Sequence, residues 1–180
     1  MHSMIALLRA VNVGGRNRLP MIDLRNVAAD LRFNAVQTYV QSGNLVFATD
    51  RADLLQIEAQ LRTAIFEKSG VETDVFLRSS EEWQLAIRQN PFEAFAQSDP
   101  SRFAVVFLTQ SPEEDAVAKL KASVKGNESI EVVGRHAYVC YPDGMGNSKL
   151  PIGVMEAKLA VRGTARNWNT VLQLLNMAQG

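Results

Sequence analysis

The sequence is poor in the residues that most often carry catalysis and metal binding. It has one cysteine, Cys140, and two histidines, His2 and His136, among 180 residues. A single cysteine excludes a disulfide within the chain, and its place in a strand-like run predicts a buried, unreactive thiol. The shortage of histidine disfavours a zinc site and a Ser-His-Asp triad. We therefore predict no metal site of the protein's own and assign no catalytic residue and no cofactor; magnesium arriving with a phosphate ligand stays open.

Long hydrophobic runs are also missing. The longest apolar runs span only a few residues, so we expect no segment that crosses a membrane and no membrane partner. The N-terminal stretch MHSMIALLRA has too short an apolar part for a secretion signal. These absences favour a cytoplasmic protein, and nothing in the sequence indicates its oligomeric state.

The formal net charge is zero, which excludes the generally basic surface of many nucleic-acid-binding proteins. The charge is nevertheless uneven along the chain. Residues 1–22 and residues 144–180 each carry a net charge of +3, so residues 23–143 carry −6. The two basic ends are therefore candidates for a focused anion site.

The first half alternates between strand-like and helix-like patterns. Apolar runs typical of strands occupy residues 4–10, 35–41, 44–49 and 72–78. Apolar residues at three- and four-residue spacing, typical of amphipathic helices, mark a helix beginning near Pro20 and another over residues 54–69. The resulting order, βαββαβ, predicts a ferredoxin-like sandwich.

The second half has a related but shorter order. Strand-like runs occupy residues 102–109, 130–133 and 136–141. Helices are expected after two capping boxes, Ser79 with Glu82 and Ser111 with Glu114, and near residues 151–161 and 167–178. This order is βαββα plus an extra C-terminal helix, a ferredoxin-like unit whose last strand is missing or replaced. We predict an α+β fold with two domains, residues 1–79 and 80–180.

Topology brings two polar loops together in the first half. The first and second strands of a split βαββαβ unit run parallel with the third between them, so the loop after strand one and the hairpin after strand two leave the same end of the sheet. The first loop contains AVNVGGRNRLPM, residues 10–21, and the hairpin contains QSGN, residues 41–44. The N-terminus of the first helix points to the same end, so an anion is the natural occupant.

A second interpretation of the first loop stays open. Gly14 and Gly15 are also the residues that a tight turn needs, because glycine adopts positive φ without strain. Their spacing matches neither the dinucleotide-binding pattern nor the P-loop pattern. The glycines alone therefore do not distinguish a phosphate-binding loop from a turn.

Two further clusters lie in the second half. GNSKLP, residues 146–151, contains Lys149 without the neighbours of a P-loop lysine, so a flexible loop is the alternative. Arg166 precedes Asn167, which is suited to cap the last helix. Arg166 favours an anion at that helix N-terminus, or else it docks one domain to the other.

Tyr39 shares a strand face with Gln37 and Gln41, because alternate residues of a strand point the same way. If this face is open, Tyr39 is placed to stack a base as RNA-binding sandwiches do. The paired aromatics of RNA-binding motifs are absent, however, and the second half is equally able to cover the face.

Three pieces of the sequence, LLRAVNVGGRNRLPM with TYVQSGNLVF, then GNSKLP, then TARNWNTVLQLL, together resemble the domain-of-unknown-function 1697 family. The resemblance runs from Met4 to about Leu175, with one departure at Ala10, where the family more often has glycine. It implies a cytoplasmic, mostly bacterial protein with an α+β fold, and no established activity. The characteristic residues are Arg9, Asn12, Gly14, Gly15, Asn17, Ser42, Gly43, Asn44, Lys149, Arg166, Asn167 and Trp168.

The leading hypothesis is a protein that binds a small phosphorylated or nucleotide-like anion in a pocket formed by glycine- and amide-rich loops. The alternatives are single-stranded nucleic-acid binding on the first sheet and a protein-interaction module without catalysis; whether the protein is an enzyme stays undecided. The predicted ligand-binding residues are Arg9, Asn12, Gly14, Gly15, Arg16, Asn17, Arg18, Gln41, Ser42, Gly43, Asn44, Ser148, Lys149, Arg166 and Asn167.

Overall fold

The computed structural model describes all 180 residues, Met1–Gly180. Contacts within the chain divide it into two compact units. Unit 1 comprises Met1–Leu85 together with Gln173–Gly180, and unit 2 comprises Ala86–Leu172. The division falls shortly after residue 79, and the C-terminal segment belongs to unit 1, whereas the prediction assigned all of residues 80–180 to a second domain. That each unit folds as an independent domain stays a prediction.

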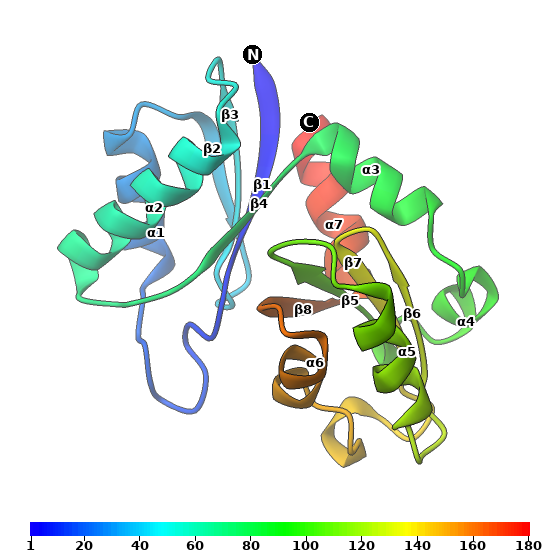
Figure 1. Ribbon diagram of the computed structural model, residues 1–180. Helices are drawn as coiled ribbons and strands as arrows, with labels where there is room; N and C mark the ends of the chain where they lie inside the picture. Colours follow the sequence, from blue (N-terminus) through cyan, green and yellow to red (C-terminus); the bar gives the residue numbers. More distant parts are fainter. The chain divides into compact units, whose positions relative to one another are not determined.

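Unit 1 contains a four-stranded sheet with two helices on one face (Figure 1). The strands lie in the order β2-β3-β1-β4, and all neighbouring pairs are antiparallel. β1 and β2 therefore run parallel with β3 between them, which confirms the predicted ferredoxin-like unit. The elements in chain order are β1 (His2–Leu8), α1 (Met21–Asp30), β2 (Asn34–Tyr39), β3 (Asn44–Thr49), α2 (Leu54–Ser69) and β4 (Val75–Ser79).

The ends of α2 follow from its flanking residues. Asp53 precedes the helix, and its side chain accepts a hydrogen bond from the backbone N–H of Gln56 at 3.1 Å. Gly70 ends the helix in the left-handed conformation, with φ of +68°. An acidic N-cap and a left-handed glycine are the usual signals for the two ends of a helix, so the predicted end before Gly70 is confirmed.

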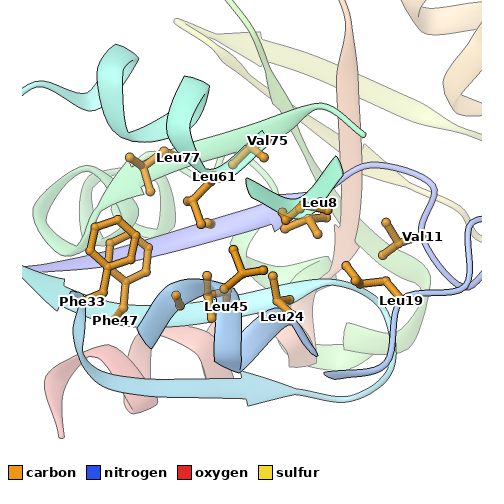
Figure 2. Close-up of a cluster of buried hydrophobic side chains, with 14 of the residues drawn as sticks. Leu8, Val11, Leu19, Leu24, Phe33, Leu45, Phe47, Leu61, Val75 and Leu77 are labelled. Carbon is orange, nitrogen blue, oxygen red and sulfur yellow. The ribbon is translucent and has the colours of Figure 1, made fainter. Parts of the chain in front are cut away.

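The core of unit 1 fills the space between the sheet and the two helices. Phe33 and Phe47 stack with ring centroids 4.2 Å apart at one end of this core, and Val11 and Leu19 lie at the other end (Figure 2). Val11 and Leu19 are at most 2% exposed. Each such side chain contributes about 1.5–3 kcal/mol through burial, so the two ends of the loop after β1 are anchored in the core.

Unit 2 repeats the same architecture. Its strands lie in the order β6-β7-β5-β8, again with antiparallel neighbours. The prediction that the last strand is missing or replaced was therefore wrong, because β8 completes a second βαββαβ unit before the expected C-terminal helix. The elements are β5 (Phe103–Leu108), α5 (Glu114–Ala122), β6 (Ser129–Val133), β7 (His136–Cys140), α6 (Ile152–Leu159) and β8 (Gly163–Asn167).

The segments outside the two repeats are mostly helical. Ser79 caps the helix that follows β4, because its Oγ accepts a hydrogen bond from the N–H of Glu82 at 3.2 Å. The second predicted capping box was wrong: α5 begins at Glu114, and no side chain caps it. The remaining elements are α3 (Ser80–Arg88), α4 (Glu93–Ser98), the 3-10 helices η1 (Pro100–Arg102) and η2 (Met145–Asn147), and α7 (Trp168–Gln179). None of the helices is both long and apolar enough to span a bilayer.

The sheet face of unit 1 that points away from α1 and α2 is buried along its central strands, whereas on the edge strand β2 Gln37 is exposed and Tyr39 is half-buried. Tyr39 pairs with Asn44, and Asn44 pairs with Leu7, so the three side chains share this face. Leu7 and Ile5 are 0% exposed, and Phe76 of β4 is 1% exposed. Base stacking across the first sheet requires an exposed face, so the central strands offer no surface for the nucleic-acid alternative.

Tyr138 of β7 provides a test of packing within unit 2. Its buried hydroxyl donates a hydrogen bond to the carbonyl oxygen of Ala86 at 2.6 Å. We expect Tyr138→Phe to lower the free energy of unfolding at pH 7 by about 1–2 kcal/mol, because this bond is lost from a buried site. Urea unfolding measures the change.

The same variant has a defined pH dependence. Burial raises the pKa of Tyr138 from 10.0 to about 12. Between these values the unfolded chain ionises the phenol while the folded chain keeps it neutral, so the phenol's contribution to stability falls as pH rises. The deficit of Tyr138→Phe relative to wild type should therefore shrink between pH 10 and pH 12. A deficit that grows in this range contradicts the assignment.

Candidate functional site

The loop after β1 forms a small hairpin. The N–H of Asn12 donates to the carbonyl oxygen of Asn17 at 3.0 Å, and the N–H of Arg16 donates to that of Val13 at 3.1 Å. Gly14 and Gly15 between them have φ of +58° and +76°. Two successive residues with positive φ are typical of the type I′ turn that closes two-residue hairpins. The glycines therefore have a structural role in the turn, whatever the loop binds.

Asn12 fastens this hairpin to the turn between β2 and β3. Its Nδ2 donates to the carbonyl oxygens of Leu19 at 2.8 Å and Gln41 at 2.9 Å, and its Oδ1 accepts from the N–H of Leu19 at 2.8 Å. Asn12 has φ of +55°, a conformation that asparagine tolerates better than most residues. The two loops that topology predicts to be neighbours are therefore side by side in unit 1.

The turn between β2 and β3 is tightly packed at Gly43. A Cβ atom at this position would lie 2.5 Å from Cγ2 of Val11 and 2.7 Å from Cβ of Leu8. The carbonyl oxygen of Gly43 also accepts a hydrogen bond from the N–H of Leu8 at 2.8 Å. The side chain of Asn44 is buried, and its Nδ2 donates to the carbonyl oxygen of Tyr39 and to Oγ of Ser42, both at 3.0 Å. Gly43 and Asn44 therefore fix the shape of the turn, and Gln41 and Ser42 form its exposed part.

Exposed positive charge in these loops comes from Arg16 and Arg18. Both are exposed, and neither forms an ion pair or a side-chain hydrogen bond. Arg9 is half-buried, and its backbone is bonded to the segment before β4. Asn17 is exposed and donates from Nδ2 to the carbonyl oxygen of Ala10 at 3.2 Å. The first turn of α1 carries Asp23, which already interacts favourably with the helix dipole, so the arginines rather than the helix N-terminus supply the attraction for an anion.

In unit 2, the predicted residue Ser148 is bonded to a carboxylate of its own chain. Its Oγ donates to Oε1 of Glu128 and accepts from the N–H of Leu150 at 2.9 Å. The hydrogen bond from Ser148, helped by backbone N–H groups and the charge of Lys149, holds the pKa of Glu128 below its usual range. Lys149 is exposed. The loop that contains GNSKLP therefore already accommodates one anionic group, the carboxylate of Glu128.

Arg166 and Asn167 lie at the end of β8. Nη1 of Arg166 donates to Oγ1 of Thr164 and to the carbonyl oxygen of Ala165, both at 2.8 Å. Burial lowers the pKa of Arg166 to about 10, so the guanidinium stays charged at neutral pH. Oδ1 of Asn167 accepts from the N–H of Thr170 at 2.9 Å, which confirms the predicted cap of the last helix. The aromatic ring of Trp168, the next residue, packs edge-on against the ring of Phe103, with the two ring centroids 5.3 Å apart.

The predicted site residues thus fall at one end of the sheet in each unit. Those of unit 1 lie in the loop after β1 and the turn after β2, and the Asn12 hydrogen bonds join these two segments. In unit 2, β5 lies between β7 and β8, with Phe103 paired with Cys140 and Ala104 paired with Asn167. The loop that leaves β7 and the end of β8 are therefore at the same end of the second sheet.

Sequence reasoning missed Glu128 and assigned no role to Lys125 or Lys158, which line a hollow with Lys149. Lys125 and Glu128 lie in the connection before β6, and Lys149 and Lys158 lie near and within α6, so no spacing in the sequence signals that the two segments meet. Cys140 has the predicted character, because it is buried and burial raises its thiol pKa to about 11.

Comparisons with known proteins identify the fold and the family. The chain has the fold of the conserved bacterial protein SP0830 from Streptococcus pneumoniae, with a TM-score of 0.73, 22% sequence identity, and 98% of each chain covered. No curated protein matches the chain significantly. The model of a family described as protein of unknown function (DUF1697) matches residues 1–138. The chain therefore belongs to the DUF1697 family, as its motifs suggested.

Proposed function

We propose that the protein binds a small phosphorylated or nucleotide-like anion through the loops of unit 1. The observation that carries this proposal is the pair Arg16 and Arg18, two exposed arginines without a carboxylate partner on a loop of fixed geometry. Guanidinium groups bind phosphate oxygens with paired, charge-assisted hydrogen bonds. A loop whose backbone is already ordered loses less conformational entropy when it binds than a flexible one does.

The other predicted residues of unit 1 divide into three roles. Exposed Asn17, Gln41 and Ser42 supply polar groups beside the arginines. Asn12, Gly43 and Asn44 fix the two loops, and Gly14 and Gly15 close the hairpin. Arg9 adds charge at the base of the loop. Within unit 2, Lys149 and Arg166 are the predicted cations, and Ser148 and Asn167 shape their loops; that they bind an anion of that unit stays a prediction.

Apolar surface beside the arginines favours an amphipathic ligand such as a nucleotide. Val13, next to the turn glycines, is 64% exposed, and Val40, which precedes Gln41, is 52% exposed. The backbone of Gln41 is bonded to Asn12, so both valines flank the same junction. Ligand sites commonly combine apolar surface with a few polar groups that orient the ligand. The single buried cysteine suits the cytoplasm, where thiols stay reduced and nucleotides are abundant.

A binding panel tests this function. Inorganic phosphate, AMP, ADP and ATP would be tested by thermal shift, and any hit would be measured by isothermal titration calorimetry. We expect at least one nucleotide to stabilise the protein, by about 2.7 kcal/mol at a concentration 100 times Kd. We expect the double variant Arg16→Gln, Arg18→Gln to weaken that binding at least tenfold.

The matched control removes the same charge from another part of unit 1. Arg62 and Lys68 lie on α2, are exposed and form no ion pair. The double variant Arg62→Gln, Lys68→Gln should therefore leave Kd unchanged within twofold. Failure of every phosphate compound to stabilise the wild type, or equal loss in both double variants, rules out the loops as the site.

A further inference from the structure

A hollow of about 280 Å³ in unit 2 brings together three lysines. Lys125 follows α5, Lys149 precedes α6, and Lys158 lies in the last turn of α6. All three are exposed and none forms an ion pair within 4.0 Å. Lysines that converge on one hollow repel each other, so an anion between them relieves that repulsion.

One carboxylate lies in the same hollow. Glu128 is held by the hydroxyl of Ser148, and its pKa lies below the usual range for glutamate. It is therefore ionised at neutral pH, and the four charged groups that line the hollow sum to +2. Glu128 is fixed by Ser148 and also interacts with the charge of Lys149, whereas Lys125 and Lys158 form no ion pair and are left for a ligand.

The rest of the lining is largely apolar. Val124, Leu150 and Val154 contribute side chains to it. Ligand pockets usually measure about 300–1,000 Å³, so this hollow suits a small ligand. A phosphate monoester carries a charge of about −1.5 to −2 at pH 7, which matches the charge of the lining, and a short carbon chain matches its apolar part.

We propose that this hollow binds a small phosphate monoester, with the phosphate among Lys125, Lys149 and Lys158 and the carbon chain against Val124, Leu150 and Val154. The site is independent of the unit 1 loops. Its ligand is smaller than a nucleotide, and its recognition depends on lysines and apolar contact rather than on arginines and a glycine hairpin.

Calorimetric titration at low ionic strength tests the site with two probes, n-propyl phosphate and inorganic phosphate. We expect n-propyl phosphate to bind about tenfold more tightly, because only it buries carbon against the apolar lining. Lys125→Gln with Lys158→Gln removes the excess charge of the lining, and we expect it to weaken n-propyl phosphate binding at least tenfold. The control, Lys68→Gln with Lys119→Gln, removes two exposed lysines outside the hollow and should change Kd less than twofold.

Glu128→Gln should change the affinity for n-propyl phosphate in the opposite direction to the lysine variants. It removes a carboxylate that repels the phosphate, so we expect n-propyl phosphate to bind several-fold more tightly. A role of Glu128 in structure alone predicts unchanged or weaker binding. Chemical shift changes confined to these lining residues in NMR spectra would further support the site.

Three outcomes overturn the inference: no binding of n-propyl phosphate at millimolar concentration, equal affinity for both probes, or equal loss in the test and control variants. The unit 1 proposal fails separately. The double variant Arg16→Gln, Arg18→Gln should bind n-propyl phosphate normally, and Lys125→Gln with Lys158→Gln should retain nucleotide binding by the unit 1 arginines.

Discussion

Gly43→Ala should destabilise unit 1 by about 3–4 kcal/mol. The new Cβ atom meets Val11 and Leu8 at 2.5 Å and 2.7 Å, and forced overpacking of this kind costs about 1–3 kcal/mol. The residue also has φ of +71°, where a side chain adds about 1–2 kcal/mol of strain. The turn has little freedom to move away, because the carbonyl oxygen of Gly43 accepts a hydrogen bond from Leu8 of the central strand β1.

Gly14→Ala is the matched control for this effect. Gly14 has φ of +58°, but no atom lies within 4 Å of a Cβ placed there. The control therefore carries the strain of a left-handed alanine without the steric clash, and we expect a loss of about 1–2 kcal/mol. Urea unfolding measures both losses, and hydrogen exchange read by mass spectrometry shows that the loss lies in unit 1. If the two variants are equally stable, the close approach at Gly43 is not a constraint on the fold.

The architecture of unit 1 was predictable because each element has a strong local signal. The helix that ends at Gly70 has an apolar stripe and a left-handed end residue, and residues 4–8 of β1 are a continuous apolar run. Apart from residues 9–20 after β1, the connections between consecutive elements of unit 1 are three to five residues long, so the order of the elements leaves few possible topologies. The neighbouring positions of the first loop and the QSGN turn then followed from topology alone.

The last strand of unit 2 was not predictable from its residues. Gly163 begins β8, and glycine is normally read as a break between elements. The structure shows why it is there: a Cβ atom would lie 2.9 Å from Cγ1 of Val106 and 3.0 Å from Cδ2 of Leu108, on the neighbouring strand β5. The close approach of β5 therefore requires glycine at position 163, and because glycine does not indicate a strand, the sequence pattern does not reveal β8.

The neighbouring positions of the two polar loops in unit 1 were predictable, and the roles of their residues were less so. The sequence placed amide side chains at the loops, but it does not show which groups they bind. Asn12, Asn44 and Asn167 each use a side-chain amide to bind backbone groups of the same unit. Short polar side chains form hydrogen bonds with backbone groups in turns and caps. A motif rich in asparagine therefore indicates a loop of fixed shape as readily as it indicates a ligand-binding loop.

Asn12→Asp should weaken unit 1 by about 2–4 kcal/mol at pH 7. The substitution keeps the shape of the side chain, the acceptor for the N–H of Leu19 and a residue that tolerates φ of +55°. It replaces the Nδ2 donor with a carboxylate oxygen that faces the carbonyl oxygens of Leu19 and Gln41. Two hydrogen bonds are lost, and a partly buried charge is left beside two acceptors.

The pH dependence of this variant identifies the cause of its loss. The two carbonyl oxygens disfavour the ionised form, so the introduced carboxyl has a raised pKa in the folded state relative to about 3.9 in the unfolded state. The penalty is therefore fully present above the folded-state pKa and declines as pH falls toward the unfolded value, where a protonated carboxyl donates to one carbonyl. Urea unfolding of wild type and variant between pH 4 and pH 7 measures the difference. If the difference in the free energy of unfolding is constant across this range, the loss does not arise from a charge that faces the carbonyl oxygens of Leu19 and Gln41. The hydrogen bonds of Asn12 would then not be what holds the two loops together.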